Sequence, residues 1–118
     1  MKFIKLLRKL ASCSDHHQHK LSCIIVNKNK VVSVGYNQIK THPKATTRYN
    51  MLHAEINALL AANCAEIRGC TAYIFRECRN GHLAMARPCE GCYKALYNAG
   101  IRKIIYTLYN TWKEETLV

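Results

Sequence analysis

Leu52-His53-Ala54-Glu55-Ile56-Asn57-Ala58-Leu59 and Arg87-Pro88-Cys89-Glu90-Gly91-Cys92 are the two stretches that organise this chain. Each stands where a helix is expected to begin. His53, Cys89 and Cys92 offer one imidazole and two thiolates. Because the two cysteines are three residues apart, both sulfurs can face one point from the first turn of a helix. The pattern predicts a zinc site with three protein ligands and a fourth tetrahedral position for water.

The combination of H-x-E with P-C-x-x-C, read here at His53, Glu55 and Pro88 to Cys92, resembles the cytidine deaminase superfamily. In that superfamily a zinc-activated water attacks an aminated base, while a glutamate that is not a zinc ligand moves protons. The resemblance covers about residues 21–106. It implies that Zn²⁺ is the cofactor, that His53, Cys89 and Cys92 bind it, and that Glu55 is the catalytic proton shuttle.

The resemblance also implies two residues that bind the substrate. A G-[YW]-N sequence at the end of a strand supplies an asparagine for the sugar, and Asn37 matches it by position and type. The alternative interpretation of Asn37 is a turn residue. The backbone N–H of Ala54, next to the histidine, is implied to bond the base carbonyl.

A C-x-x-C pair taken alone also occurs in redox sites and structural zinc knuckles. A structural zinc site needs a fourth ligand. Cys64, Cys70 and Cys78 are candidates for it, but their spacing does not form the paired cysteines expected of a zinc knuckle. A redox pair leaves His53 and Glu55 without a role. Both alternatives therefore rank below a catalytic zinc site.

The length of 118 residues predicts a single domain, residues 1–118, with one core. The seven cysteines are an odd number, and Cys23 lies in an apolar strand-like run, so we expect reduced thiols and a cytoplasmic protein. No apolar run approaches membrane-spanning length, and the N-terminus lacks a signal-peptide core. The net charge of +11 favours an anionic partner, either a phosphorylated small molecule or nucleic acid.

Hydrophobic periodicity and turn residues predict the order of the elements. The expected helices cover residues 1 to about 13, 53 to about 63 and 89–99, and the expected strands cover 21–27, 31–37, 71–75, 101–106 and, as a short antiparallel return, 112–118. Gly100 is the expected C-cap of the third helix. This order predicts an α/β, three-layer, cytidine-deaminase-like fold: a mixed four- or five-stranded sheet with helices on both faces.

The predicted reaction is hydrolytic deamination of a cytosine base in a nucleotide or nucleoside. Conversion of dCMP to dUMP is favoured, because residues 55–59 resemble the deoxycytidylate branch and the positive charge suits a phosphate. The basic loop residues Lys40, Lys44 and Arg48 are candidates to meet that phosphate. Cytidine and deoxycytidine come second, because superfamily members that act on free cytidine typically end with an antiparallel return strand.

Two further functions stay open at the level of sequence. A deaminase of single-stranded DNA or RNA needs aromatic stacking platforms, for which the candidates are Tyr36, Tyr49, Tyr106, Tyr109 and Trp112. A non-catalytic, zinc-stabilised binding module is the rival from another class, and the presence of Glu55 argues against it. We also expect a homo-oligomer, since a short last strand leaves a sheet edge to cover.

Overall fold

The computed structural model describes residues 2–15, 19–39 and 52–117. In chain order the elements are α1 (Ile4–Ser12), β1 (Leu21–Asn27), β2 (Lys30–Tyr36), α2 (Ala54–Ala61), α3 (Cys64–Ile67), β3 (Thr71–Arg76), α4 (Glu90–Asn98), β4 (Lys103–Leu108) and β5 (Thr111–Thr116). The predicted order of elements is confirmed, with the short helix α3 added. The predicted phosphate-binding candidates Lys40, Lys44 and Arg48 lie outside the described residues.

The strands form one mixed sheet in the order β2-β1-β3-β4-β5. β1 pairs antiparallel with β2 and β3, whereas β3 and β4 are parallel and α4 makes the crossover between them. The predicted return strand is β5, which pairs antiparallel with β4 and places Tyr106 opposite Lys113. The β1–β2 hairpin turns at Lys28 and Asn29, whose positive φ values of 47° and 71° suit a tight two-residue turn.

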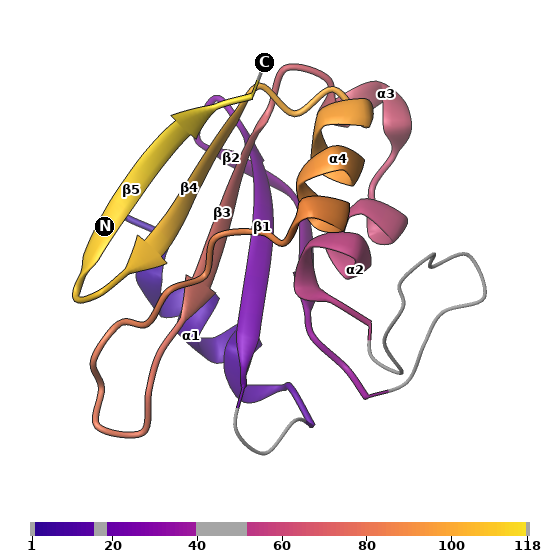
Figure 1. Ribbon diagram of the computed structural model, residues 1–118. Coiled ribbons are helices and arrows are strands. Elements are labelled where there is room, and N and C mark those ends of the chain that lie inside the picture. The colour runs from indigo at the N-terminus through magenta and orange to yellow at the C-terminus, as the bar shows by residue number, and fades with distance from the viewer. Residues whose placement is uncertain (1, 16–18, 40–51, 118) are drawn as a thin grey trace.

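Helices cover both faces of the sheet, as predicted (Figure 1). On one face, Leu7 and Ala11 of α1 pack against Ile24 and Phe75 of the central strands. The other face carries α2 and α4, whose buried residues meet the inward side chains of the strands; this cluster includes Ala54, Ala58, Leu96, Cys23, Ile25, Ile74, Ile104 and Tyr106. Burial of these apolar side chains is the main driving force for forming the three layers.

The bounds of several predicted elements differ from the observed ones by one to three residues. The helix expected to reach residue 63 ends at Ala61, because Asn63 caps the separate helix α3 by accepting a 3.0 Å hydrogen bond from the Ala65 N–H. The strand expected at 101–106 begins at Lys103. Gly100 lies just beyond α4 with φ of +96°, which confirms the predicted helix stop.

The position of α2 is fixed by close contact with β2. A Cβ on Gly35 would lie 2.4 Å from the Ala58 nitrogen and 2.6 Å from the Ala54 carbonyl oxygen, so the helix backbone rests directly on this glycine. Ser33 donates a 2.6 Å hydrogen bond to the Ala58 carbonyl, and the Tyr36 N–H donates one of 3.0 Å to Asn57. These contacts set where the N-terminus of α2 lies.

The six cysteines whose side chains are described are all free thiols: Cys13, Cys23, Cys70, Cys78, Cys89 and Cys92. Cys23 is fully buried in the core, as its apolar surroundings in the sequence predict. Within the described ranges, no helix is both long enough and apolar enough to cross a bilayer.

Replacement of Gly35 by alanine is expected to push α2 off β2. The added methyl group meets backbone atoms that cannot rotate away, so we expect a loss of about 1–3 kcal/mol in the free energy of unfolding. Urea unfolding of the metal-free protein measures it. Gly91→Ala is the matched control, because a Cβ there meets nothing within 4 Å and alanine favours helix. Equal stability of the Gly35→Ala variant and the unchanged protein would contradict the close-contact argument.

Candidate active site

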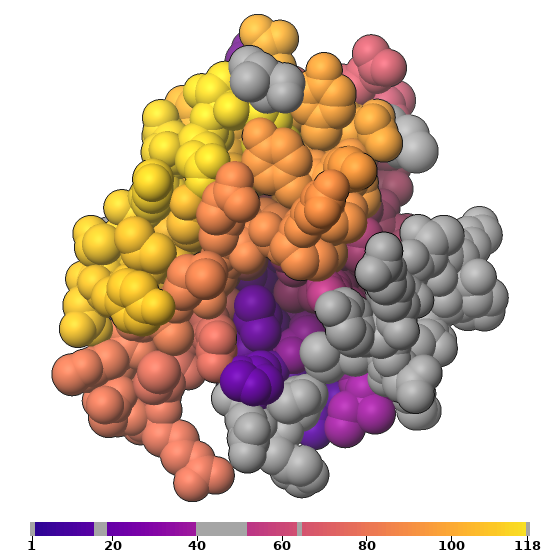
Figure 2. All heavy atoms as spheres, in the orientation of Figure 1, coloured from indigo at the N-terminus to yellow at the C-terminus, as the bar shows by residue number. Residues whose placement is uncertain are grey.

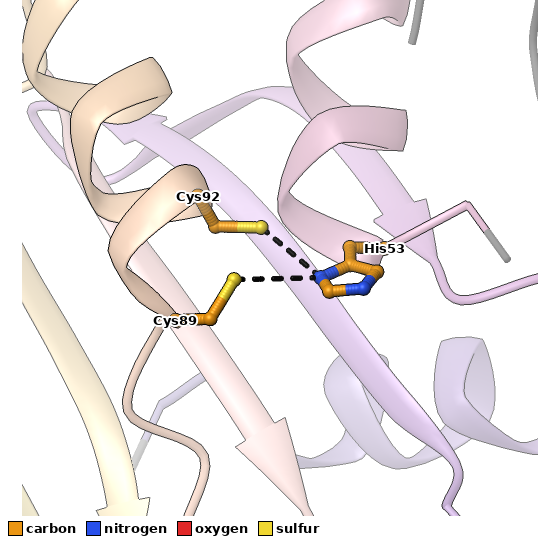
Figure 3. A group of neighbouring side chains, drawn as sticks. All are labelled: His53, Cys89 and Cys92. Carbon is orange, nitrogen blue, oxygen red and sulfur yellow. Dashed lines mark hydrogen bonds between the residues drawn. The ribbon is translucent and has the colours of Figure 1, made fainter. Parts of the chain in front are cut away.

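Two helix N-termini bring the predicted metal ligands together. His53 is the N-cap residue of α2 and Cys89 is that of α4, both with extended backbones. Their carbonyl oxygens accept the first helical hydrogen bonds, from Asn57 at 2.9 Å and Tyr93 at 2.8 Å. Neither side chain caps its own helix. The imidazole and the two sulfurs point toward one another across the gap between the helices (Figure 3).

The distances within this cluster suit a small metal ion. His53 Nδ1 lies 3.2 Å from Cys92 Sγ and 3.8 Å from Cys89 Sγ, and all three ligand atoms fall within 4.8 Å of one another. Cys92 is buried, whereas Cys89 is exposed and leaves one side accessible. Two sulfurs and one imidazole form a donor set typical of zinc. In the part of the chain that the structure describes, this is the one His/Cys/Asp/Glu cluster with metal-site spacing, and it includes neither Cys70 nor Cys78.

Glu55 lies beside the cluster but is not part of it. Its residue is 4% exposed, and its carboxylate forms a hydrogen bond with the Cys92 side chain. α2, which carries Glu55, packs on Cys23 of β1, whose pKa is raised by burial and further by the Glu55 charge. Burial raises the pKa of Glu55, although hydrogen bonds from backbone and Cys92 oppose the rise. The cluster therefore has a proton-binding group directly next to its buried sulfur.

The electrostatics of the cluster favour a cation. Burial raises the pKa of Cys92, and the negative charges of Glu55 and Cys89 raise it further. Burial lowers the pKa of His53, which keeps its imidazole neutral, as a metal ligand must be. A divalent cation would offset the negative charges that oppose ionisation of the Cys92 thiol. The N-terminal ends of α2 and α4 add positive potential at the same point, which favours the thiolate forms that bind a metal. These residues fit zinc.

The two predicted substrate residues lie at the same edge of the sheet. Ala54 is the first residue of α2 and is 1% exposed, so its N–H belongs to the unsatisfied first turn. Asn37 follows β2 and is 2% exposed. Its Oδ1 accepts a 2.9 Å hydrogen bond from the Leu21 N–H, and its Nδ2 donates to the His19 carbonyl. Asn37 thus joins the end of β2 to the start of β1, and its contact with a sugar stays a prediction.

The sequence did not predict Arg76 at this edge, nor its contact with His19, although the histidine-containing loop before β1 was expected near the mouth of the site. Arg76 ends β3, and its Nη2 lies 2.5 Å from His19 Nδ1. Because side chains alternate along a strand, Arg76 shares a face with Ile74, which pairs with Cys23 beneath Glu55. Arg76 therefore lies at the rim of the Glu55 site. The alternating pattern of β3 continues to Arg76, one residue beyond the predicted strand, and could have placed Arg76 on it.

The sequence of this chain matches that of a known protein family. Residues 1–108 match the model of the cytidine and deoxycytidylate deaminase zinc-binding region. The chain belongs to this family. A mouse (Mus musculus) deoxycytidylate deaminase is 29% identical over 99 residues, which cover 72% of this chain and 50% of that protein. The chain thus spans about half the length of this curated relative.

Solved structures confirm the fold of this family member. A dCMP deaminase from the cyanophage S-TIM5, crystallised with dCMP and dUMP, superposes with a TM-score of 0.64 at 22% identity, over 89% of this chain and 77% of that one. A cytidine deaminase from Burkholderia pseudomallei superposes with a TM-score of 0.71 at 16% identity, over 98% of this chain and 91% of that one. The predicted cytidine-deaminase-like α/β fold is correct.

We expect Glu55→Gln to stabilise the metal-free protein in a pH-dependent way. The pKa of Glu55 is raised in the folded state, so its contribution to stability is present below the unfolded pKa of about 4.3 and is lost as pH rises through the folded pKa. Urea unfolding curves of the variant and the unchanged protein should coincide near pH 4 and separate above it, with the variant more stable. Glu66→Gln, at an exposed carboxylate, is the control. A constant difference across this pH range would contradict the assigned cause.

Proposed function

We propose that this chain is a zinc-dependent deaminase domain that removes the amino group of a cytosine base in a nucleotide by hydrolysis, with dCMP as the favoured substrate. The observation that carries the proposal is Glu55, a buried carboxylate placed beside the His53, Cys89 and Cys92 cluster without joining it. A zinc site that serves folding alone has no use for such a group. The family relationship and the deoxycytidylate deaminase relatives support the same reaction.

In this proposal the chain's own residues divide the chemistry. Zinc held by His53, Cys89 and Cys92 supplies Lewis acidity, which lets water act as a nucleophile near neutral pH. Glu55 accepts a proton from the attacking water and delivers it to the ring nitrogen of the base. It then takes the remaining proton from the hydroxyl that has added to the ring carbon and gives it to the departing amino group. The sum is one water consumed, the amino group replaced by a carbonyl, and ammonia released. The raised pKa of Glu55 suits a group that both accepts and donates protons.

The substrate is held by polar groups around this centre. The Ala54 N–H, at the start of α2, bonds the base carbonyl, and Asn37 contacts the sugar. A nucleotide also needs a cation for its phosphate. Arg76 is half-buried at the rim of the site. Its guanidinium contacts the imidazole of His19, which carries no negative charge and so does not offset the positive charge of Arg76. Arginine is suited to bidentate contact with phosphate, so Arg76 supports a nucleotide substrate.

A second candidate is a free nucleoside, cytidine or deoxycytidine. The observation that favours it is β5, which runs antiparallel to β4, as the resemblance implies for members that act on free cytidine. A polynucleotide substrate has less support. Of the predicted stacking platforms, Tyr106 is 2% exposed and presents no open ring face, whereas Trp112 is partly exposed and packs on Phe75, and Tyr109 is 76% exposed. Self-association of the chain remains a prediction.

Ammonia release by the zinc-loaded protein tests the proposed function. The substrates are dCMP, deoxycytidine, cytidine and a cytosine-containing single-stranded oligonucleotide. We expect turnover of dCMP at the highest kcat/KM, and a loss of at least about 100-fold in kcat for Glu55→Gln with zinc retained, because proton transfer contributes on that order. Full activity of zinc-loaded Glu55→Gln would contradict the mechanism. Turnover of nucleosides alone would favour the second candidate.

The same panel separates phosphate recognition from chemistry. With Arg76→Gln, kcat/KM should fall for dCMP and stay unchanged for deoxycytidine, because only dCMP carries the phosphate. Arg79→Gln is the matched control, since Arg79 is an exposed arginine in the loop that follows β3. An equal fall for both substrates would show that Arg76 supports the fold of the site and does not bind the phosphate.

A further inference from the structure

We propose that Glu115 of β5 is a positioning residue for the metal centre: it holds Arg87 in place and thereby fixes the turn that presents Cys89. The inference rests on the proposed function, because it takes Cys89 as a metal ligand. It gives β5 a role that the family motif does not contain. Figure 2 shows β5, in yellow, next to the chain that leads into α4, in orange.

Glu115 and Arg87 form a two-pronged ion pair. Arg87 Nε donates to Glu115 Oε2 at 2.9 Å, and Arg87 Nη2 donates to Oε1 at 3.3 Å. The Tyr106 hydroxyl of β4 donates to the same Oε2. Because Tyr106 is buried, the carboxylate is held from the sheet as well as by the arginine. The Arg87 guanidinium and the Tyr106 hydroxyl keep the pKa of Glu115 below its usual range, so the group is ionised at neutral pH.

Arg87 is also held from the side of α4. Its guanidinium carbon lies 5.5 Å from the centre of the Tyr93 ring, within the range of a cation–π contact. Tyr93 is the residue whose N–H bonds the Cys89 carbonyl at 2.8 Å. Arg87 therefore joins β5, β4 and the first turn of α4.

The link from Arg87 to Cys89 is short and stiff. One residue separates them, Pro88, which is buried and whose ring fixes φ. Just before Arg87, the Ala86 N–H bonds the Thr107 carbonyl of β4 at 2.9 Å. The anchored Arg87 thus stands two residues before Cys89, on a short and stiff connection. Cys89 itself is exposed, so its own packing adds little to its position.

The size of the interaction indicates what it does. The side chains of Arg87 and Glu115 are 48% and 24% exposed, and an ion pair in such a position contributes little to the stability of a domain. Groups that orient metal ligands, by contrast, change metal affinity by about 10–100-fold when they are removed. We therefore expect the loss of Glu115 to appear in zinc affinity before it appears in unfolding.

The neighbouring residue provides the matched control. Glu114 is the same residue type on the same strand, but strand alternation puts it on the opposite face. There it pairs with Lys103 at 3.5 Å, where both side chains are substantially exposed. Glu114→Gln removes the same charge as Glu115→Gln and leaves the contacts of Arg87 in place.

The experiment measures zinc affinity by competition with a chromophoric chelator, and thermal unfolding of each metal-free protein. We expect Glu115→Gln to weaken zinc binding by about 10-fold or more, while Glu114→Gln binds zinc like the unchanged protein. The metal-free melting temperatures of both variants should lie close together. Tyr106→Phe removes one of the two groups that hold Glu115, so it should give a smaller loss of affinity and serves if Glu115→Gln folds poorly.

Three results would overturn the inference or its basis in distinguishable ways. Equal zinc affinity for Glu115→Gln, Glu114→Gln and the unchanged protein would overturn the positioning role alone. A loss of zinc affinity accompanied by a clear fall in the melting temperature of metal-free Glu115→Gln would show that Glu115 acts only on the fold. Failure of the unchanged protein to bind zinc would overturn the proposed function itself.

Discussion

The meeting of two helix N-termini, at His53 and Cys89, is the constraint on which the rest of the structure depends. A cluster of one imidazole and two thiols forms only if α2 and α4 begin at the same place. Gly35 of β2 lets α2 lie directly on the sheet, and the parallel β3–β4 pair fixes where α4 starts its crossover. Binding sites of open α/β sheets commonly lie beyond the carboxyl ends of parallel strands, and this one follows that rule.

The same meeting explains the electrostatics of the site. The starts of helices favour negative charge, whereas burial and the charges of Glu55 and Cys89 oppose ionisation of the Cys92 thiol. A bound dication resolves that conflict for the two sulfurs and leaves Glu55 as a group that can gain and lose a proton. The cluster thus suits a metal ion, and the carboxylate beside it suits proton transfer.

The sequence predicted the parts of the fold that depend on local pattern. His53 and Cys89 were expected at helix starts and are N-cap residues. A sheet of four or five strands with helices on both faces was expected, and five strands were found. The break between α2 and α3 was not predicted, because Asn63, the N-cap of α3, stands among alanines that favour a continuous helix. Arg76 with His19, and Arg87 with Glu115, join residues far apart in the chain. Pairing of that kind depends on strand order and register, which no local pattern contains.

The central claim is the identity of the metal ligands, and X-ray absorption spectroscopy of the zinc-loaded protein tests it most directly. If Cys89, Cys92 and His53 are the ligands, the spectrum contains two sulfur ligands at about 2.3 Å and two nitrogen or oxygen ligands at about 2.0–2.1 Å, the fourth being one solvent position. A shell of three or four sulfurs would mean that another cysteine completes a closed structural site. A shell without sulfur would mean that zinc does not bind at the meeting point of α2 and α4.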